Sequence, residues 1–302
     1  MQLLDGKKIS QDIQSEIREE VRKITADGKR PPHLVAILVG EDHASQTYVK
    51  NKMHACEYVG FSSTLMRLPS NISQEALLKK LDNYNADPDV DGILVQMPLP
   101  AHITPQEVTQ HIHPSKDVDG FHPLNVGLMT LNFPCLMPAT PSGIIELLHR
   151  YNIPTKGKHC VVVGRSRIVG RPTSILMSRG GDPGEASVSL CHINTPPEDL
   201  KRICPQGDIL IVAVGKPGLI TGDMVKEGAV VIDVGITRVE DPTTKSGYRL
   251  KGDVDFEAVS KKASYITPVP GGVGPMTISM LLRNTLDAFN SRYKEVEKIV
   301  QE

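Results

Sequence analysis

The sequence predicts two α/β domains, and three observations lead to this prediction. The chain has 302 residues, about twice the length of a common single domain. Helical and strand patterns alternate along it, and the strand patterns are unbroken apolar runs, which are typical of parallel sheets covered on both faces. Two sets of these runs are separated by LMPATPSGIIELLHRY, in which Pro and Thr precede an apolar-periodic segment. We therefore expect one domain at 1–140 and a second at 141–274.

The first domain begins with a helical pattern and continues with alternating strands and helices. In DGKKISQDIQSEIREEVRKITADGKR, the residues Ile9, Ile13, Ile17 and Val21 recur every four positions, as on one face of a helix. An apolar run up to Gly40 predicts the strand that follows. The same alternation then gives helix ASQTYVKNKMHACEYVG, strand STLMRL, helix SQEALLKKLDNYNA and strand DGILVQMPLP.

The second domain has its own set of apolar strand patterns, KHCVVVG, ASVSL, DILIVAVG and AVVIDVG. The final segment TISMLLRNTLDAFNSRYKEVEKIV is helical by pattern and follows a loop rich in Gly and Pro. We expect the resulting C-terminal helix, 275–302, to cross back and pack on the first domain.

Composition excludes several classes of partner. Thirty-four basic residues stand against 35 acidic ones, so no excess of positive charge is available to hold a phosphate backbone, and nucleic acid is not expected as a partner. The five cysteines contain no C-x-x-C pair and are expected to be buried reduced thiols. The start MQLLDGKKIS lacks a basic stretch followed by an apolar run, and no apolar run of 18 residues follows. These observations predict a soluble cytoplasmic protein with no membrane partner.

The second domain opens with a pattern for dinucleotide binding. KHCVVVGRSRIVGRP reads as a strand, a turn with Gly164 and Gly170, and a helix, an arrangement that directs helix N-terminal amides at a pyrophosphate. The glycine fingerprint is incomplete, because Ser166 and Val169 stand where further glycines are usual. The strands that follow supply the βαβ context, although a tight turn without ligand is the alternative. A hydrolase nucleophile elbow at Ser166 is set aside, since Ile168 occupies the place of its second glycine.

Cofactor choice depends on charge near the end of the next strand. That strand ends SLCHINTP, without the acidic residue that NAD sites use for the ribose 2′-hydroxyl. Arg165 in the turn is available for a 2′-phosphate, with His192 nearby in the pattern. NADP is therefore favoured over NAD, and a solvated surface arginine is the alternative interpretation of Arg165.

The first domain carries a second group of candidate site residues. Tyr48 and Lys52 are four apart on an expected helix and share one face, and Gln96 stands at the carboxyl end of a buried strand, where α/β proteins bind ligands. A half-buried ring beside a surface lysine, and a capped strand end, are the alternatives. Asp117 and Asp119 resemble the start of a calcium loop, but the later ligands are missing, so metal is not expected and an Asx-type turn is the local alternative.

Several stretches together carry a resemblance. They occur in the order YVKNK, DGILVQMPLP, KDVDGFHPLNVG, VVVGRSRIVGRP, GDILIVAVGKPG, VVIDVGI, GDVDF and ITPVPGGVGPMT. In this order they closely resemble the bifunctional methylenetetrahydrofolate dehydrogenase/cyclohydrolase family, nearly from end to end. The resemblance implies NADP-dependent oxidation of 5,10-methylenetetrahydrofolate to the methenyl form and its hydrolysis to 10-formyltetrahydrofolate. It also implies a folate domain at 1–140, a Rossmann-type NADP domain at 141–274, a cleft between them, a homodimer and a role in purine biosynthesis.

The resemblance assigns the first-domain residues to folate chemistry. Tyr48 would stack on the aminobenzoyl part of folate, and Lys52 would be the central cyclohydrolase residue. Gln96 would hydrogen-bond near Lys52 and tune it, and Asp119 would bind the pterin. Lysine with a lowered pKa suits proton movement during addition of water, and a carboxylate suits adjacent N–H donors on a ring edge.

The resemblance also assigns residues of the second domain. Gly164, Arg165 and Ser166 would line the cofactor phosphates, with Ile193 and Ile236 also at the cofactor. The loop ITPVPGGVGPMT has no side chain that hinders close approach, so its backbone at Pro270, Gly271 and Gly272 is expected to lie against substrate and nicotinamide. A rigid connector before the last helix is the alternative for this loop.

Two features depart from the family pattern and leave alternatives open. The segment SRGGDPGEASVSL is similar in length to the loop of mitochondrial NAD-linked relatives, which bind phosphate and magnesium there. Ile193 stands where those relatives and many bacterial forms have arginine, so one phosphate partner is missing and NAD stays open beside NADP. The rival functions are a dehydrogenase acting on another small substrate, a folate hydrolase without the oxidation step, and a non-catalytic nucleotide sensor.

Overall fold

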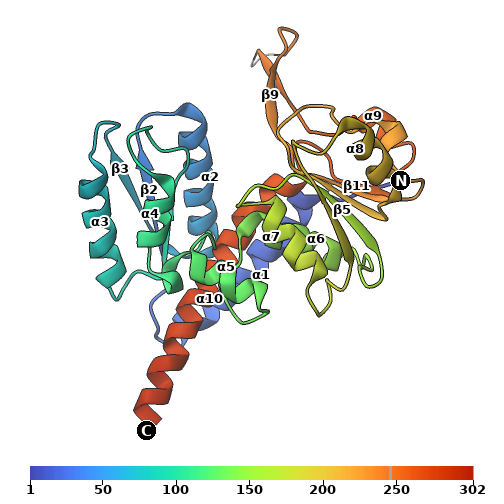
Figure 1. Cartoon of the computed structure of the whole chain (residues 1–302). Helices are drawn as coiled ribbons and strands as arrows, with labels where there is room; N and C mark the ends of the chain where they lie inside the picture. The colour runs from blue at the N-terminus through green and yellow to red at the C-terminus, as the bar shows by residue number, and fades with distance from the viewer. Residues whose placement is uncertain (245–246, 302) are drawn as a thin grey trace. The chain divides into compact units, whose positions relative to one another are not determined.

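The chain folds into two compact units, each made of two separate parts of the sequence. The computed structural model describes residues 1–244 and 247–301, and only the backbone for 293–301. Unit 1 consists of Met1–Ser10 and Thr140–Thr277, and unit 2 of Gln11–Ala139 and Ile278–Glu302. Each unit contains its own parallel sheet (Figure 1). The predicted fold class, α/β with parallel sheets and a Rossmann-type second domain, is confirmed.

Unit 2 is built on a three-stranded parallel sheet of order β3-β2-β4. The strands are β2 (His33–Val39), β3 (Ser62–Leu68) and β4 (Gly92–Val95). The helices are α2 (His43–Val59), α3 (Gln74–Ala86), α4 (Pro105–His111), the 3₁₀ turn η1 (Pro114–Lys116), α5 (Pro123–Thr130), and parts of α1 (Gly6–Ala26) and α10 (Val273–Gln301). All residues of β4 and six of the seven residues of β2 are buried, as expected for a sheet covered on both faces.

The two faces of this sheet are covered by different helices. Alternate residues of β2, beginning with Val35, pack in one cluster with Leu77 and Leu81 of α3 and Val108 of α4. On the other face, Gly92 is glycine because a side chain there would press on Leu34 and on the α10 residue Thr285. The unit therefore has a helix layer on each side of the sheet.

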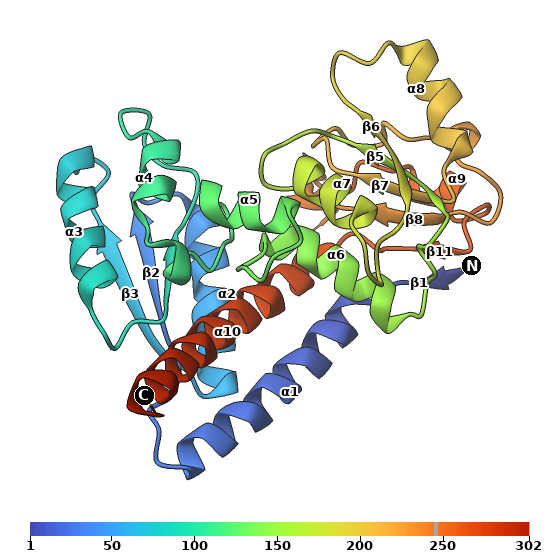
Figure 2. The same ribbon diagram turned by 60° about the horizontal axis from the view of Figure 1, so that its bottom comes forward.

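The N-terminal and C-terminal helices lie side by side in both views (Figures 1 and 2). Arg283 of α10 pairs with Glu20 of α1 at 2.6 Å, and the Asn284 amide donates to the carbonyls of Val118 and Met137 at 2.8 Å each. These contacts fix α10 within unit 2. Residue 302, the last residue of the helix expected at 275–302, lies outside the described residues.

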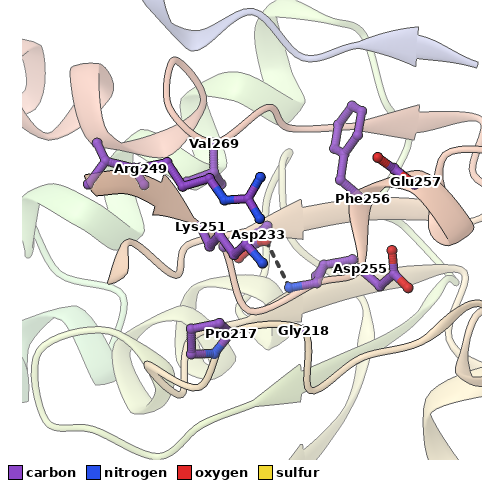
Figure 3. A pocket seen from close by; sticks show the side chains of 12 residues that line it. Pro217, Gly218, Asp233, Arg249, Lys251, Asp255, Phe256, Glu257 and Val269 are labelled. Atoms are coloured by element: carbon purple, nitrogen blue, oxygen red, sulfur yellow. Dashed lines mark hydrogen bonds between the residues drawn. The ribbon is translucent and has the colours of Figure 1, made fainter. Parts of the chain in front are cut away.

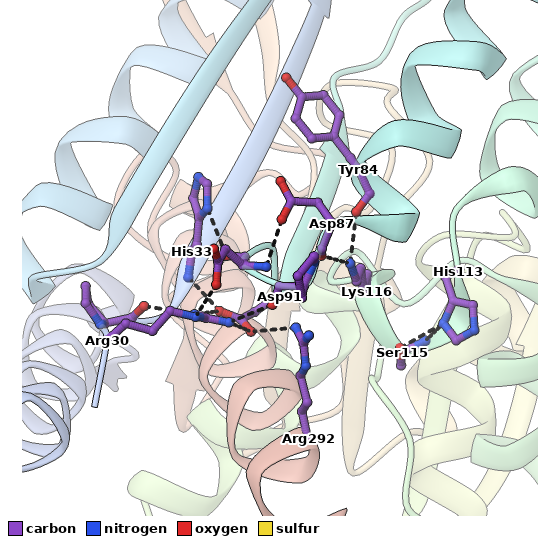
Figure 4. A network of polar contacts seen from close by, with 12 residues as sticks. Arg30, His33, Tyr84, Asp87, Asp91, His113, Ser115, Lys116 and Arg292 are labelled. Atoms are coloured by element: carbon purple, nitrogen blue, oxygen red, sulfur yellow. Dashed lines mark hydrogen bonds and ion pairs between the residues drawn. The ribbon is translucent and has the colours of Figure 1, made fainter. Parts of the chain in front are cut away.

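A network of ion pairs and hydrogen bonds surrounds the buried Asp91 next to the start of β4 (Figure 4). The side chain of Asp91, just before β4, is fully buried and accepts two hydrogen bonds from Arg30, at 2.6 and 2.9 Å. The backbone N–H of His33 donates to the same carboxylate at 2.8 Å, and Arg292 of α10 lies 3.8 Å away. Nearby, Lys116 donates to carbonyls at the end of α3, at 2.6 and 2.9 Å. The network joins the segments that begin β2 and β4 to α3 and α10.

Unit 1 is built on a six-stranded sheet of order β1-β11-β8-β7-β5-β6, in which every pairing is parallel. Its strands are β1 (Gln2–Leu3), β5 (His159–Val163), β6 (Ser187–Cys191), β7 (Ile209–Val212), β8 (Val230–Asp233) and β11 (Tyr265–Ile266). Its helical segments are α6 (Ala139–Arg150), α7 (Gly170–Ser178), α8 (Pro197–Ile203), η2 (Cys204–Gln206), η3 (Gly222–Met224) and α9 (Phe256–Val259).

Two parts of unit 1 differ from the expected organisation. Residues 1–10, expected in the first domain, lie here because Leu3 of β1 pairs with Ile266 of β11. A separate antiparallel hairpin, β9 (Thr237–Glu240) with β10 (Tyr248–Lys251), follows β8 and was not expected. In the hairpin, partly buried and exposed residues alternate, as in strands with one solvated face, so an apolar run could not indicate it.

Among the helices of the described residues, none combines the length and the apolar character that crossing a bilayer requires.

Candidate functional site

Helix α2 presents the first group of candidate residues on one face. The helix begins after Asp42, whose carboxylate accepts from the Ser45 N–H at 2.7 Å, and ends at Gly60 in the left-handed conformation. Residues at spacings of four lie above one another on a helix. This spacing places Tyr48 and Lys52 in one row, as the sequence predicted, and extends the row to Cys56.

The amine of Lys52 meets the side chain of Gln96, which directly follows β4. Lys52 Nζ donates to Gln96 Oε1 at 3.1 Å. Gln96 is itself fixed, because its backbone N–H donates to the Ile37 carbonyl at 2.9 Å and its side-chain amide donates to the Met97 carbonyl at 2.7 Å. The bond from Gln96 to Ile37 continues the β2–β4 ladder by one residue beyond the strand end. The predicted contact between Lys52 and Gln96 is thus made by a rigid strand end and a helix face.

Burial changes the acid–base properties around Lys52. Removal from water lowers the pKa of the Lys52 amine, and the nearby Asp119 carboxylate opposes this shift. Burial raises the pKa of Asp119 to about 6, against the effect of Lys52, while Asp117 adds to the rise. Both groups are partly accessible to solvent, so a ligand can reach them. Burial therefore disfavours the charged forms of both Lys52 and Asp119, while each group favours the charge of the other.

The two aspartates of the segment KDVDG differ in their contacts: among the described residues, Asp117 is hydrogen-bonded within the turn, and Asp119 is not. Asp117 is buried and its carboxylate accepts from the His122 N–H at 2.7 Å and from the Asn125 amide at 3.0 Å. Gly120 has φ 71°, and a side chain there would press on the backbone of Met137. Asp119 makes no hydrogen bond within the described part of the chain. Asp117 thus builds the turn, whereas Asp119 lies close enough to Lys52 for each charge to affect the pKa of the other.

Tyr48 and Cys56 lie on either side of Lys52 along the helix row. Tyr48 is 45% exposed, which suits stacking against a ligand better than service in the core. Cys56 is fully buried, and burial raises the pKa of its thiol to about 12, so the thiol is neutral beside the amine. Sequence reasoning missed Cys56 as a neighbour of Lys52, although its spacing of four from that residue could have indicated it.

In unit 1, the turn between β5 and α7 forms a cradle with no room for side chains at its glycines. Gly164 has φ 126°, and a Cβ there would press on the carbonyl of Ala213. A Cβ at Gly170 would press on the Gly164 carbonyl. The Ser166 hydroxyl accepts from the N–H groups of Val169 and Gly170 at 3.1 and 3.3 Å, so it orders the start of α7.

Other groups of the same turn remain available to a ligand. The side chain of Arg165 is exposed and has no ion-pair or hydrogen-bond partner among residues 1–244 and 247–301. The backbone N–H groups of Arg165 and Ser166 are likewise not taken up by other described residues. A strand-to-helix turn with open amides and a free arginine can hold phosphate oxygens.

The remaining residues predicted at the cofactor lie after β6 and β8. Ile193 is 93% exposed in a turn that His192 closes, with the His192 N–H donating to the Thr195 hydroxyl at 2.9 Å. Ile236 is 46% exposed and follows Gly235, where a side chain would press on Asp253. Both isoleucines follow carboxyl ends of parallel strands, the edge at which open α/β sheets bind ligands.

The loop with Pro270, Gly271 and Gly272 is held by the start of α1. The Lys7 N–H donates to the Gly271 carbonyl at 2.9 Å, and a side chain at Gly6 would press on Gly272. Gly271 has φ 108°, and a Cβ at Gly272 would lie 2.7 Å from the Pro268 carbonyl. The loop therefore needs its glycines for its own conformation, as the rigid-connector alternative requires, and its contact with substrate stays a prediction.

A cavity of about 500 Å³ lies beside these segments in unit 1 (Figure 3). Its lining mixes apolar and charged side chains, including Asp233, Arg249, Lys251, Phe256 and Val269. It contains none of the residues that the sequence analysis assigned to the site. Within the described ranges, no group of three or more His, Cys, Asp or Glu side chains is arranged to hold a metal ion.

Comparison with known proteins matches both parts of the chain. Residues 4–119 match the family model "Tetrahydrofolate dehydrogenase/cyclohydrolase, catalytic domain", and residues 138–293 match "Tetrahydrofolate dehydrogenase/cyclohydrolase, NAD(P)-binding domain". The chain is 57% identical over 294 residues to "Bifunctional protein FolD" of Christiangramia forsetii, covering 97% of this chain and 98% of that protein.

Solved structures give the same result. The bifunctional FolD enzyme from Campylobacter jejuni has a TM-score of 0.90 and 48% identity, over 97% of this chain and 99% of that chain. The FolD enzyme of Trypanosoma brucei, solved with NADP cofactor and an inhibitor, has a TM-score of 0.90 and 41% identity, over 96% and 97% of the two chains.

Proposed function

Because the chain belongs to the tetrahydrofolate dehydrogenase/cyclohydrolase family, we propose that it catalyses two successive reactions on one-carbon folates. In the first, 5,10-methylenetetrahydrofolate is oxidised to 5,10-methenyltetrahydrofolate with NADP. In the second, water adds to the methenyl carbon and the ring opens to 10-formyltetrahydrofolate with release of a proton. Folate chemistry is assigned to 1–140, with the C-terminal helix, and NADP binding to 141–274.

The observation that carries this proposal is the coupled group formed by Lys52, Gln96 and Asp119. Lys52 donates to Gln96 at 3.1 Å, and burial lowers the pKa of its amine while the nearby Asp119 opposes this shift, so the amine releases its proton more easily than a surface lysine does. A nucleotide sensor has no use for such a group. Oxidation of an alcohol would also need a proton acceptor, so this group alone does not exclude a dehydrogenase of that kind; the match of both parts of the chain to the folate family does.

The turn at Gly164 fits a dinucleotide. Its two glycines leave no side chain between the backbone and a ligand, and its open N–H groups and the free guanidinium of Arg165 suit phosphate oxygens. Ser166 acts through the helix start that it orders, and Ile193 and Ile236 offer apolar contact at the same sheet edge. NADP, when bound, accepts the hydride from the methylene carbon. The protein's task in this step is alignment and exclusion of water.

Hydrolysis depends on Lys52. The methenyl carbon is already electrophilic and cationic, so the step needs a group that takes the proton of the attacking water. The buried amine has a lowered pKa and therefore a larger neutral fraction than a surface lysine has. Gln96 fixes the position of that amine through its side-chain oxygen, and Asp119 stabilises the ammonium that forms after proton transfer.

Three further contacts hold the folate. Asp119 has no internal hydrogen bond among the described residues, and it accepts from the adjacent N–H donors on the pterin edge. The exposed ring of Tyr48 stacks on the aminobenzoyl part. The backbone of Pro270, Gly271 and Gly272 contacts the substrate close to the reacting carbon.

The cellular setting forms part of the same proposal. We assign the enzyme to the cytoplasm as a homodimer, with its product 10-formyltetrahydrofolate used in purine biosynthesis and without nucleic acid as a partner. The resemblance supports these assignments, and the near balance of 34 basic and 35 acidic residues supports the last. Light scattering after size-exclusion chromatography measures the assembly, and a monomer mass would contradict the homodimer.

The experiment that tests the two-step function is a comparison of Lys52→Ala with Lys50→Ala. Lys50 is an exposed residue of the same helix, so the control changes the same charge away from the site. We expect Lys52→Ala to lower methenyltetrahydrofolate hydrolysis by about 100-fold or more, as loss of a general base does, while Lys50→Ala leaves it unchanged. Full cyclohydrolase activity in Lys52→Ala would contradict the assigned role.

A further inference from the structure

The carboxylate of Asp233 collects hydrogen bonds from several loops of unit 1. Asp233 ends β8 and is 4% exposed. Its Oδ1 accepts from the N–H groups of Gly235 and Asp253, and its Oδ2 accepts from the N–H of Val254, each at 2.9 Å. Its backbone N–H donates to the Thr267 hydroxyl at 2.7 Å, and that hydroxyl donates back to the Asp233 carbonyl at 3.3 Å. One residue thus ties together the segments after β8, β10 and β11.

Asp253 adds a second carboxylate to this junction. It is fully buried, and its Oδ2 accepts from the N–H groups of Val214 and Gly215 at 2.7 and 2.9 Å. Its Oδ1 is buried without a hydrogen-bond partner in the described part of the chain. The segment after β7 is therefore fastened to the same junction as the segments after β8 and β11.

The two carboxylates are packed tightly against the backbone of neighbouring glycines. A side chain at Gly235 would press on the Asp253 carboxylate, and one at Gly252 would press on the Asp233 carboxylate. Gly235 directly precedes Ile236, and Thr267 lies three residues before Pro270. The positions of both predicted site segments are therefore set by how the carboxylates are held.

Burying the two carboxylates of Asp233 and Asp253 next to each other costs folding free energy. We take this cost as an indication that the two residues do more than stabilise the fold. Burying two like charges side by side is unfavourable, and burial with the neighbouring Asp253 raises the pKa of Asp233 to about 6. In return, loop N–H groups that no strand partner satisfies obtain charge-assisted hydrogen bonds, which are shorter and stronger than neutral ones. The segments so fixed follow β7, β8 and β11, whose carboxyl ends share the ligand-binding edge of the sheet.

We propose that Asp233 and Asp253 are positioning residues for the oxidation step, because they fix the loops that carry Ile236 and Pro270–Gly272 at the edge where the dinucleotide binds. This inference rests on the proposed function. Neither carboxylate touches the reacting atoms. Their effect is on the alignment of hydride donor and acceptor, for which misplacement by about 1 Å can cost roughly 100-fold in rate.

Because one chain catalyses both reactions, the kcat values of the dehydrogenase and the cyclohydrolase can be compared in the same variant. In Asp233→Asn and Asp253→Asn, the side-chain volume is kept but an NH₂ group replaces one acceptor oxygen. We expect the dehydrogenase kcat to fall by about 10- to 100-fold and the cyclohydrolase kcat to fall by less, because the loop at 270–272 contacts the substrate in both reactions, whereas Lys52, which acts only in hydrolysis, lies in unit 2. The control is Asp208→Asn, which removes a carboxylate that accepts from the His159 N–H at 3.0 Å at the opposite edge of the same sheet, before β7. Both kcat values should be unchanged in the control.

A second pair of variants keeps the inference testable if the asparagine variants fail to fold. Thr267→Val removes only the hydroxyl that joins Asp233 to the start of the Pro-Gly loop, and Thr267→Ser retains it. The dehydrogenase kcat should fall in the valine variant and recover in the serine variant. Thermal unfolding of each variant shows whether a rate loss reflects unfolded protein.

The outcomes separate the inference from the function on which it rests. Absence of oxidation by the unaltered chain would overturn the proposed function. If the unaltered chain oxidises the substrate, unchanged dehydrogenase kcat in Asp233→Asn, Asp253→Asn and Thr267→Val would overturn the positioning role. A parallel fall of both activities together with lowered unfolding temperature would also overturn it, since that result marks a purely structural role.

Discussion

The amine of Lys52 and the side-chain oxygen of Gln96, 44 positions apart in the chain, are joined by a hydrogen bond of 3.1 Å. Lys52 comes from the face of α2 and Gln96 from the end of β4, so the pair is set by the packing of a helix on a sheet. The amide of Gln96 is committed to the Met97 carbonyl, which leaves its oxygen for Lys52. In this orientation, the side-chain oxygen of Gln96 accepts a hydrogen bond from the Lys52 amine. Because the Gln96 side chain is neutral, it does not take a proton from Lys52.

Replacing this neutral acceptor with a carboxylate should shift the pH profile of hydrolysis. In Gln96→Glu, the ammonium form of Lys52 gains an opposite charge at hydrogen-bond distance, so the pKa of Lys52 rises and less neutral amine is present at pH 7. We expect lower cyclohydrolase activity at neutral pH and a rising limb of the profile displaced to higher pH. The control Gln11→Glu makes the same change of charge at an exposed position of α1. An undisplaced profile in Gln96→Glu would refute this role for Gln96.

Asp119 should make the fold less stable as the pH rises through the acidic range. Its pKa is about 6 in the folded chain against the ordinary value of 3.8, so the folded state binds the proton more tightly than the unfolded state does. The contribution to the free energy of unfolding therefore falls between about pH 4 and pH 6 and stays low above that range. Asp119→Asn removes this effect, and its stability relative to the unaltered chain should increase from about pH 4 to pH 7. Denaturant titrations at several pH values measure the difference, and a constant difference would show that Asp119 is not perturbed.

Removal of Arg30 should destabilise the chain much more than removal of a surface arginine. Arg30→Ala leaves the fully buried Asp91 carboxylate without its two closest charged hydrogen bonds, and the nearest ion pair that remains among the described residues is with Arg292 at 3.8 Å (Figure 4). Breaking a buried pair in this way costs about 3 kcal/mol or more. The control is Arg22→Ala, whose pair with Glu19 is exposed on both sides and is worth at most about 1 kcal/mol. Equal shifts in the denaturation midpoints would contradict the importance of the network.

The cradle at Gly164 should not tolerate alanine. In Gly164→Ala, the residue would have to keep φ 126° while its Cβ pressed on the Ala213 carbonyl, at a cost of about 1–3 kcal/mol for the conformation alone. We expect a raised KM for NADP and a lowered unfolding temperature. The control Gly180→Ala adds a methyl group where no atom lies within 4 Å, and both quantities should stay unchanged. An unaltered KM for NADP in Gly164→Ala would remove the cradle from the proposed cofactor site.

The sequence predicted those parts of the molecule that depend on local pattern. The apolar runs at β2, β4, β5, β7 and β8 became buried parallel strands, because such runs can be satisfied only between two helix layers. The spacing of Tyr48 and Lys52 predicted their shared helix face. Their assigned roles remain predictions.

Features that depend on distant pairing were not predictable in this way. The two-residue strand β1 is too short to show a period, so its pairing with β11 cannot be recognised locally. The charged neighbour of Asp119 is Lys52, which is supplied by the distant helix α2. The junction of Asp233 and Asp253 likewise joins loops separated along the chain. Such contacts are fixed by tertiary packing alone.

The most direct test is the initial rate at which the purified chain oxidises 5,10-methylenetetrahydrofolate, measured in parallel with NADP and with NAD, followed by the rate of methenyl hydrolysis in the same preparation. We predict reduction of NADP in preference to NAD, and formation of 10-formyltetrahydrofolate by the same chain. No oxidation with either dinucleotide, or oxidation without any catalysed hydrolysis, would contradict the two-step function.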